Sequence, residues 1–208
     1  MRLRMAITNG YATLSQVKAA ARITDSVDDE LIETAIESSS RMIDGHCERR
    51  FYTNGTETRY FAAVSSYVVD VDDLAGTAIT VETSAGLDGV YDETWQATDL
   101  QLEPLNRTNA GLEFPITRLR AVGDYLFPVD PVAHETGVKV TGVFGFSTEI
   151  PAAVKQACIL ASLRQYQRYS SALGVAGFGD MGAVRVARID PDIQSMLMPF
   201  RKVTHGVA

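Results

Sequence analysis

The chain has 208 residues, of which 46% are hydrophobic and 22% are charged. This balance is typical of a globular protein with one sizeable core or two smaller ones, and it argues against long disordered segments. No apolar run approaches the length of about 18 residues that a membrane span needs, and none follows the basic residues Arg2 and Arg4. We therefore expect neither a membrane protein nor a secreted one.

Charge is distributed unevenly along the sequence. The net charge is −7, and residues 1–104 hold 8 Lys and Arg against 18 Asp and Glu, whereas residues 105–208 hold 11 against 8. An acidic half and a mildly basic half favour polar, head-to-tail contacts. Nucleic-acid recognition needs clustered cations that neutralise several phosphates, and the sequence has no such cluster. Sequence-specific DNA binding is therefore not expected.

Two helices are predicted near the N-terminus. Thr13, followed by apolar residues at helical spacing, predicts a short capped helix that ends before Ile23. A longer helix begins near Asp28, and its apolar positions recur at three- and four-residue spacing, which predicts one buried face. These positions are Ile32, Ala35, Ile36, Ser39, Met42 and Ile43. Acidic side chains recur on its other faces, namely Glu30, Glu33, Glu37, Asp44 and Glu48, and Arg41 is placed to pair with Glu37.

Between Thr53 and Ser147 the hydrophobic periodicity becomes that of strands. Six candidate strands are separated by turn-forming Asn, Asp, Gly and Pro residues. They are Thr56–Ala62, Tyr67–Val71, Ala78–Thr83, Thr98–Leu102, Ile116–Val122 and Val138–Phe146. This spacing predicts a small antiparallel sheet or a barrel-like insertion.

A third helix and a glycine-rich segment complete the chain. Pro151 opens the helix at a position where its missing N–H costs nothing. From Ala152 to Leu163 the helix is apolar nearly all round, so we expect it at the centre of the fold or between subunits. Four glycines then lead into the strand-like Ala183–Ile189, after which Asp190-Pro191-Asp192 caps a short helical segment ending at Arg201.

No motif for catalysis, cofactor binding or metal binding is found. The glycine-rich loop lacks the Gly-Lys-Ser/Thr of a phosphate-binding loop and has Asp180 where a phosphate would lie. The three histidines are far apart, and Cys47 and Cys158 lack metal-ligand spacing, so buried thiols are expected. No nucleophile signature of the Gly-x-Ser-x-Gly type occurs. We therefore expect no enzymatic activity and no cofactor.

Two other classes of function stay open. Trp95 lies in a stretch rich in Gly, Asp and Thr, where it is either a packed sheet residue or a platform on which a sugar stacks. In the second case the β-rich part would be a module that binds a glycan or a host protein. A small enzyme is the other alternative, and it would need a convergent polar cluster.

Three blocks of the sequence carry a family resemblance. The first, Tyr11 to Tyr52, has a short helix, a turn and a long helix that ends in Cys47-Glu48-Arg49-Arg50-Phe51-Tyr52. The second, Val138 to Ser171, has a strand ending in Phe144-Gly145-Phe146 and the helix opened by Ile150-Pro151. The third and most specific, Leu173 to Arg201, has the order loop, strand, short helix and tail. Together they resemble the head-to-tail connector (adaptor) proteins of long-tailed bacteriophages.

The resemblance implies an α+β fold in three parts. Residues 1–52 and 150–172 form a small helical bundle with a central apolar helix, and residues 53–149 form an antiparallel β-rich insertion. Residues 173–208 form an extended C-terminal arm with a glycine-rich loop, a strand, a short helix and a docking tail. We expect Ala183 to Phe200 to be a docking arm that becomes ordered on its partner, and the alternative is a strand and helix packed on the protein's own core.

The implied function is that of a structural virion protein. Its copies form a ring, expected to be a dodecamer, beneath the portal protein, where the ring extends the DNA channel and provides the platform for a stopper or tail-completion protein. Genomic DNA passes through without sequence-specific binding. The implied location is the head-tail connector of the virion, after assembly in the host cytoplasm.

The resemblance also implies two sets of contact residues. Portal or subunit contacts are expected at Gly177, Phe178, Gly179, Asp180, Arg185, Arg188, Asp190, Ile193, Leu197, Phe200 and Arg201. Like charge on the wall of a DNA channel keeps the duplex sliding, so the lumen-facing candidates are Glu30, Glu33, Glu37, Asp44 and Glu48.

Overall fold

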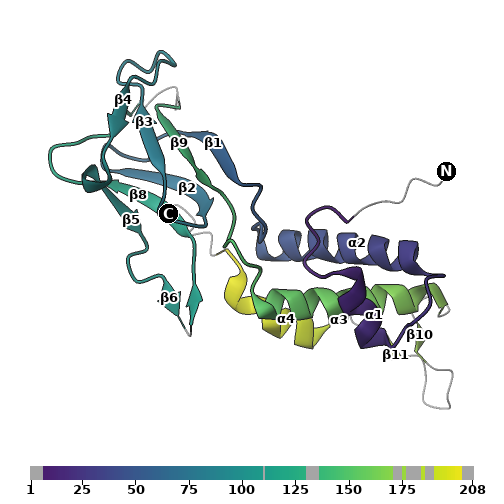
Figure 1. Cartoon of the computed structure of the whole chain (residues 1–208). Coiled ribbons are helices and arrows are strands. Elements are labelled where there is room, and N and C mark those ends of the chain that lie inside the picture. The colour runs from purple at the N-terminus through teal and green to yellow at the C-terminus, as the bar shows by residue number, and fades with distance from the viewer. Residues whose placement is uncertain are drawn as a thin grey trace, which may run out of the picture. The chain divides into compact units, whose positions relative to one another are not determined.

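The chain has a mixed α+β fold, as predicted, and it divides into two compact units. The structure is a computed structural model that describes residues 7–109, 111–129, 136–170, 175–176, 184–185 and 190–202. Met1–Arg49 and Ile150–Ala208 form one unit, called the helical unit, and Arg50–Glu149 form the other, called the β unit (Figure 1). None of the helices in the described ranges has the length and apolar composition of a membrane span.

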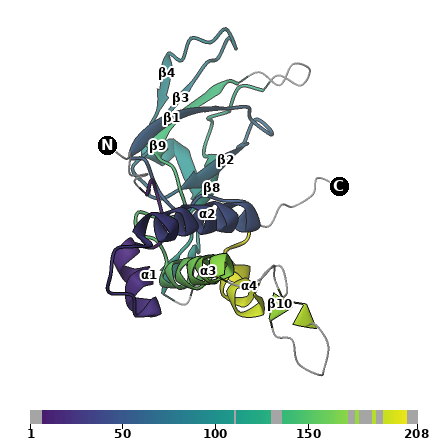
Figure 2. The same cartoon turned by 90° about the vertical axis from the view of Figure 1, so that its right-hand side faces the viewer.

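The helical unit is built around α3. Its helices are α1 (Leu14–Ala21), α2 (Asp29–Cys47), α3 (Ala152–Ser170) and α4 (Pro191–Leu197), followed by the 3-10 turn η2 (Met198–Phe200). Two strands of two residues, β10 (Val175–Ala176) and β11 (Val184–Arg185), pair antiparallel. Helix α3 packs against α1, α2 and α4, which confirms the central place predicted for the apolar helix (Figure 2).

Local signals in the sequence explain where the helices begin. Thr13 and Gln16 form a capping box at the start of α1, because each side chain accepts a hydrogen bond from the other residue's backbone N–H. The side chain of Asp190 caps α4 by accepting a bond of 3.0 Å from the N–H of Asp192, with Pro191 in the first turn.

One side of α3 is completely buried within this unit. Val154, Ala157 and Cys158 are completely buried against α2, whose Ile36 and Ile43 are also 0% exposed. On the other side Gln156 is exposed and Leu160 is 36% exposed. The apolar residues on one side of the helix therefore belong to the core, and polar and apolar residues on the other side lie at the surface.

The short helix near the C-terminus packs on its own chain. Ile193, Leu197 and Phe200 are 3%, 1% and 5% exposed, and the backbone N–H of Lys202 donates to the carbonyl oxygen of Cys47 over 2.8 Å. This corrects the expectation of a docking helix that waits for a partner. The apolar spacing of these side chains is satisfied by the core of the helical unit.

The β unit contains two antiparallel sheets. The first has the order β1-β9-β3-β4 and the second β2-β8-β5, and a bridge between Leu74 and Phe144 connects β2 with the residue after β9. The strands of the first sheet are β1 (Thr56–Phe61), β9 (Val138–Val143), β3 (Thr80–Thr83) and β4 (Glu93–Trp95). Those of the second are β2 (Val68–Leu74), β8 (Ile116–Ala121) and β5 (Leu100–Glu103), the last preceded by the 3-10 turn η1 (Ala97–Asp99). A further hairpin, β6 (Thr108–Asn109) with β7 (Leu112–Glu113), lies between β5 and β8.

All six predicted strands occur, with their ends shifted by up to three residues. Strands β4, β6 and β7 were not predicted, because two or three residues are too few to show alternation.

An apolar core to which both sheets contribute lies in the β unit. It includes Val69, Ile116, Leu119 and Val140, which are 0% exposed and come from both sheets. Trp95 is 5% exposed, its ring stacks on Phe127 with centroids 4.4 Å apart, and its Nε1–H donates to Thr83 Oγ1 over 2.9 Å. Trp95 is therefore a packed sheet residue, and a glycan-binding role for its ring is not supported.

Candidate interaction surface

The helical unit has a small open groove between α3 and α4. Its apolar floor and polar rim are formed by Met42, Ala161, Arg164, Gln165, Arg168, Asp190 and Ile193. Asp190 Oδ2 lies 3.2 Å from Nη1 of Arg164, whereas Arg168 lies on an exposed turn of α3. The groove thus combines an apolar floor with a partly cationic rim. Such a combination suits an apolar anchor side chain with a carboxylate beside it.

The predicted portal and subunit contacts have different environments. Asp190 and Ile193 line the groove, Leu197 and Phe200 are buried in the core, and Arg201 is exposed. Arg185 lies on β11. Five of the predicted contacts fall outside the described residues, namely Gly177, Phe178, Gly179, Asp180 and Arg188.

The acidic side chains of α2 do not form one exposed row. Glu30 and Glu48 are exposed, and Glu48 ends the helix with a left-handed backbone (φ 54°). Glu33 is only 7% exposed and belongs to the buried face. Glu37 and Asp44 are partly buried, and both lie beside Arg41.

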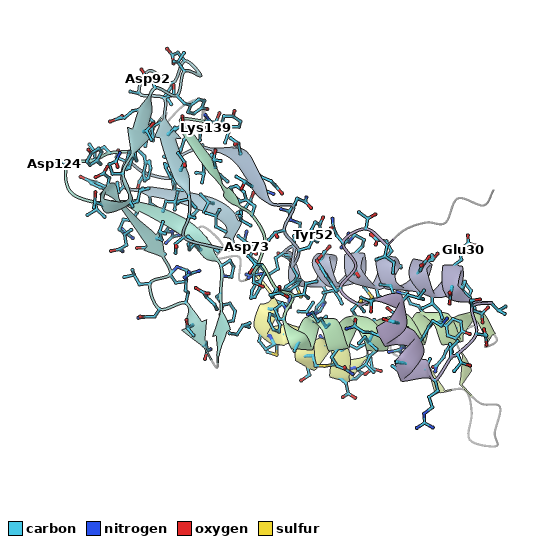
Figure 3. The ribbon with its side chains drawn as sticks, viewed as in Figure 1. Glu30, Tyr52, Asp73, Asp92, Asp124 and Lys139 are labelled. Carbon is cyan, nitrogen blue, oxygen red and sulfur yellow. The ribbon has the colours of Figure 1, made fainter. Side chains whose placement is uncertain are left out.

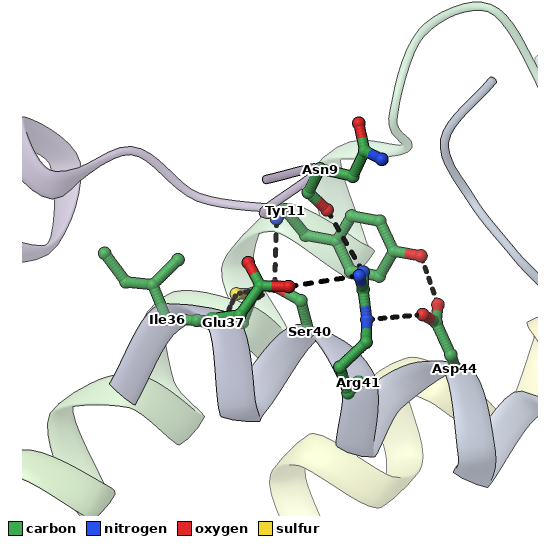
Figure 4. A network of polar contacts seen from close by, with 8 residues as sticks. Asn9, Tyr11, Ile36, Glu37, Ser40, Arg41 and Asp44 are labelled. Carbon is green, nitrogen blue, oxygen red and sulfur yellow. Dashed lines mark hydrogen bonds and ion pairs between the residues drawn. The ribbon is translucent and has the colours of Figure 1, made fainter. Parts of the chain in front are cut away.

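Arg41 organises a polar network on α2 (Figure 4). Its guanidinium lies 3.2 Å from Glu37 Oε1 and 2.9 Å from Asp44 Oδ2, and it donates to the carbonyl oxygen of Asn9 over 3.1 Å. The hydroxyl of Tyr11 donates to the same Asp44 carboxylate, and the Tyr11 ring is 1% exposed. The network therefore fastens the segment before α1 onto α2. The predicted Arg41–Glu37 pair is confirmed, and its role here is structural.

The β unit carries a strong excess of negative charge. Comparing the two halves of the sequence did not reveal it, because the unit extends across both halves. Residues 50–149 hold 6 Lys and Arg against 15 Asp and Glu, whereas the remaining residues hold 13 against 11. Each of the six cations is ion-paired with a carboxylate of the same unit. The pairs are Arg50–Glu57, Arg59–Glu57, Arg59–Asp72, Arg107–Glu113, Arg118–Asp70, Arg120–Glu103 and Lys139–Glu82. The acidic charge that is left lies mainly on loops, as for Asp92 and Asp124 (Figure 3).

Two neighbouring loops of the β unit carry five exposed apolar side chains, which we call the loop patch. Its members are Val64, Tyr67, Val122, Tyr125 and Leu126, with exposures of 66%, 55%, 41%, 40% and 53%. The backbone joins the two loops, because the N–H of Ala121 donates to the carbonyl of Tyr67 over 2.9 Å and that of Phe127 to the carbonyl of Ser66 over 2.8 Å. Sequence reasoning missed this patch, since its members are far apart in the chain and single apolar residues in loops are unremarkable.

Two kinds of side chain that could carry chemistry, metal ligands and thiols, were assigned no catalytic role by the sequence. In the part of the chain that the structure describes, no three His, Cys, Asp or Glu side chains come together as metal ligands would. Cys47 and Cys158 are free and 0% exposed, as the sequence predicted for buried thiols. Burial raises the pKa of the Cys47 thiol to about 11 and also raises the pKa of Cys158. Both thiols are thus poor nucleophiles at neutral pH.

Comparison with known proteins points in one direction. Residues 11–75 match the family model described as phage gp6-like head-tail connector protein. The fold is similar to a chain in the neck of an empty gene transfer agent (GTA) particle solved with C6 symmetry, with a TM-score of 0.55, 15% identity and coverage of 96% of this chain and 94% of that chain. A chain from the neck of the native GTA particle solved with C12 symmetry gives a TM-score of 0.54, 13% identity and coverage of 96% and 93%.

A chain from the virion of the native gene transfer agent particle gives a TM-score of 0.54 at 14% identity, with coverage of 96% and 94%. Among curated proteins, none matches the sequence of the chain. The match over residues 11–75 confirms the predicted resemblance to head-tail connector proteins of phages.

Proposed function

We propose that this chain is a structural head-tail connector, a protein that joins the DNA-filled head of a phage-like particle to its tail. The observation that carries the proposal is that the family match and the fold similarity agree. Residues 11–75, which include α1, α2, β1 and β2, match a connector family, and nearly the whole chain has the fold of chains from neck structures.

The proposal includes a ring of identical copies. The related folds come from necks solved with C6 and C12 symmetry, and a twelve-fold ring is the stoichiometry we propose for this chain. Closed rings are built from head-to-tail contacts in which two different surfaces of the same chain meet. The portal protein on one side of the ring and a stopper or tail-completion protein on the other are the proposed partners.

DNA passes through such a ring without tight binding. The net charge of −7 and the acid excess of the β unit disfavour contacts with phosphates. Among the acidic residues of α2, Glu30 and Glu48 are exposed and are the ones we propose as lumen contacts. Filter binding of duplex DNA should give no submicromolar affinity at physiological salt, and such an affinity would exclude a passive channel wall.

Deletion of the gene that encodes this chain tests the connector role. DNA-filled heads without tails should accumulate, and expression of the chain from a plasmid should restore tailed particles. A Cys47→Ser/Cys158→Ser double variant serves as a control, because the proposed role involves no thiol chemistry, and it should restore tails. Normal yields of tailed particles without the chain would contradict the proposal.

A further inference from the structure

We infer that the loop patch of one copy docks into the α3–α4 groove of the next copy. This inference rests on the proposed ring and names the two surfaces that meet in it. The loop patch presents three aliphatic side chains and two tyrosines to solvent, with exposures from 40% to 66%. Exposed apolar groups gathered in one place mark interaction sites more often than single ones do.

Contacts with buried residues and backbone hydrogen bonds fix the position of the loop patch. The ring of Tyr125 contacts Trp95 with centroids 5.3 Å apart, and Trp95 in turn stacks on the buried Phe127. The two backbone hydrogen bonds between the loops fix Tyr67 relative to the segment that contains Leu126. Aromatic and aliphatic side chains that are ordered before binding lose little entropy when a partner covers them.

Charge decides which surface of a neighbouring copy is suitable. Asp124 lies inside the patch and is exposed, and the six cations of the β unit are already paired with its own carboxylates. A contact between two β units would bring together two units that each hold 15 acidic and 6 basic residues. Like charges repel across an interface, so the patch should meet the other unit.

The α3–α4 groove has the complementary features. Its floor is apolar at Met42, Ala161 and Ile193, and Arg168 is exposed at its rim. An apolar side chain of the patch would lie on the floor, with Asp124 opposite Arg168. The two surfaces are different parts of the chain, as a head-to-tail ring contact requires.

Charge exchange between the two surfaces tests the inference. Ring assembly of the full chain on its portal protein is followed by cryo-electron microscopy and sedimentation over a concentration series. Asp124→Arg should raise the concentration needed for assembly at least about tenfold. The double variant Asp124→Arg/Arg168→Asp should bring this concentration most of the way back to the wild-type value. Asp92→Arg is the matched control: it changes the charge of the β unit equally at an exposed loop outside the patch, and should change assembly less than about threefold.

The apolar side chains of the loop patch are tested separately, with a control of their own. Tyr67→Ser/Leu126→Ser should prevent ring closure, whereas Leu105→Ser, at a position 69% exposed between β5 and β6, should leave it unchanged. A photo-crosslinker in place of Tyr67 then identifies the neighbour in the wild-type background. Crosslinks to α3 or α4 of another copy support the inference.

Three results would overturn the inference. Wild-type rings with crosslinks to a β unit, to the portal or to a tail protein assign the patch to that surface instead. Unchanged assembly of the Tyr67/Leu126 and Asp124 variants shows that the patch is not a ring contact, while the connector role stands. If the wild-type chain forms no ring with its portal, the proposed function itself fails, and the inference fails with it.

Discussion

Asp190 connects two helices through one carboxylate: Oδ2 lies 3.2 Å from Nη1 of Arg164 on α3, and Oδ1 accepts the N–H of Asp192 at the start of α4. The same residue thus caps α4 and ties it to the central helix. This arrangement explains why a helix of seven residues, too short to be stable alone, is ordered on the helical unit.

Two substitutions at Asp190 separate these roles. Asp190→Asn keeps an oxygen for the cap and loses only a partly exposed ion pair, so it should lower the free energy of unfolding by less than about 1 kcal/mol. Asp190→Ala loses both interactions and should cost about 1 kcal/mol more. Urea unfolding followed by far-ultraviolet circular dichroism measures both. Equal losses for the two variants would show that the side chain does not cap the helix.

Leu197 tests whether the C-terminal helix belongs to the core. Leu197→Ala should destabilise the protein by about 2–5 kcal/mol, because it leaves a cavity at a position that is 1% exposed. Met198→Ala, at a neighbouring position that is 73% exposed, should change stability by less than about 0.5 kcal/mol. The comparison is made by thermal and urea unfolding. A loss at Leu197 as small as that at Met198 would restore the docking-arm interpretation.

The helix α4 shows what the sequence can and cannot predict. Its start was predicted correctly, because Asp190 and Pro191 are local signals. Whether a partner or the protein's own core buries it stayed open, because apolar spacing defines a face without saying which surface covers it. The same limit applies to Glu33, whose position in the helical pattern gave no sign that it is 7% exposed.

The candidate surfaces depend on long-range pairing. The loop patch exists because the loop before β2 is hydrogen-bonded to the end of β8, about 50 residues later in the chain. The α3–α4 groove similarly brings Met42 to Ile193. Strands β1 to β9 were predicted in part from alternation, but their order in two sheets, and therefore the ion pairs between them, follows from the tertiary fold.

The backbone conformation at position 145 and the closeness of a neighbouring carbonyl both require a glycine there. Its φ is +140°, and a Cβ atom there would lie 2.4 Å from the carbonyl oxygen of Tyr52. Gly145→Ala should therefore destabilise the β unit by about 1–3 kcal/mol or more. Gly76→Ala is the control, since its Cβ would meet nothing within 4 Å. Near-ultraviolet circular dichroism and the fluorescence of Trp95 follow unfolding of the β unit. Similar midpoints for both variants would contradict the close contact.

The β unit should lose stability in acid. Hydrogen bonds from Arg59 and Arg50 lower the pKa of Glu57 below its usual 4.5, and Arg120 does the same for Glu103. A carboxylate with a lowered folded-state pKa contributes stability that is present above its unfolded pKa and is lost as pH falls through the folded one. The midpoint of urea unfolding should therefore fall as pH drops below about 4.5.

Glu57→Gln identifies the source of this pH dependence. The variant should be less stable than the wild type at neutral pH, because Arg50 and Arg59 lose a charged partner. Its stability should also fall less steeply in acid, since one of the groups that take up a proton is missing. An unchanged slope below about pH 4.5 would show that Glu57 is not among the titrating groups.

The most direct measurement is cryo-electron microscopy of the purified chain mixed with the portal protein of the same particle. A connector should form a coaxial ring on one face of the portal, with the channel continuous through both and twelve copies of the chain around it. Portal particles that stay bare at saturating concentrations of the folded chain would contradict the connector role.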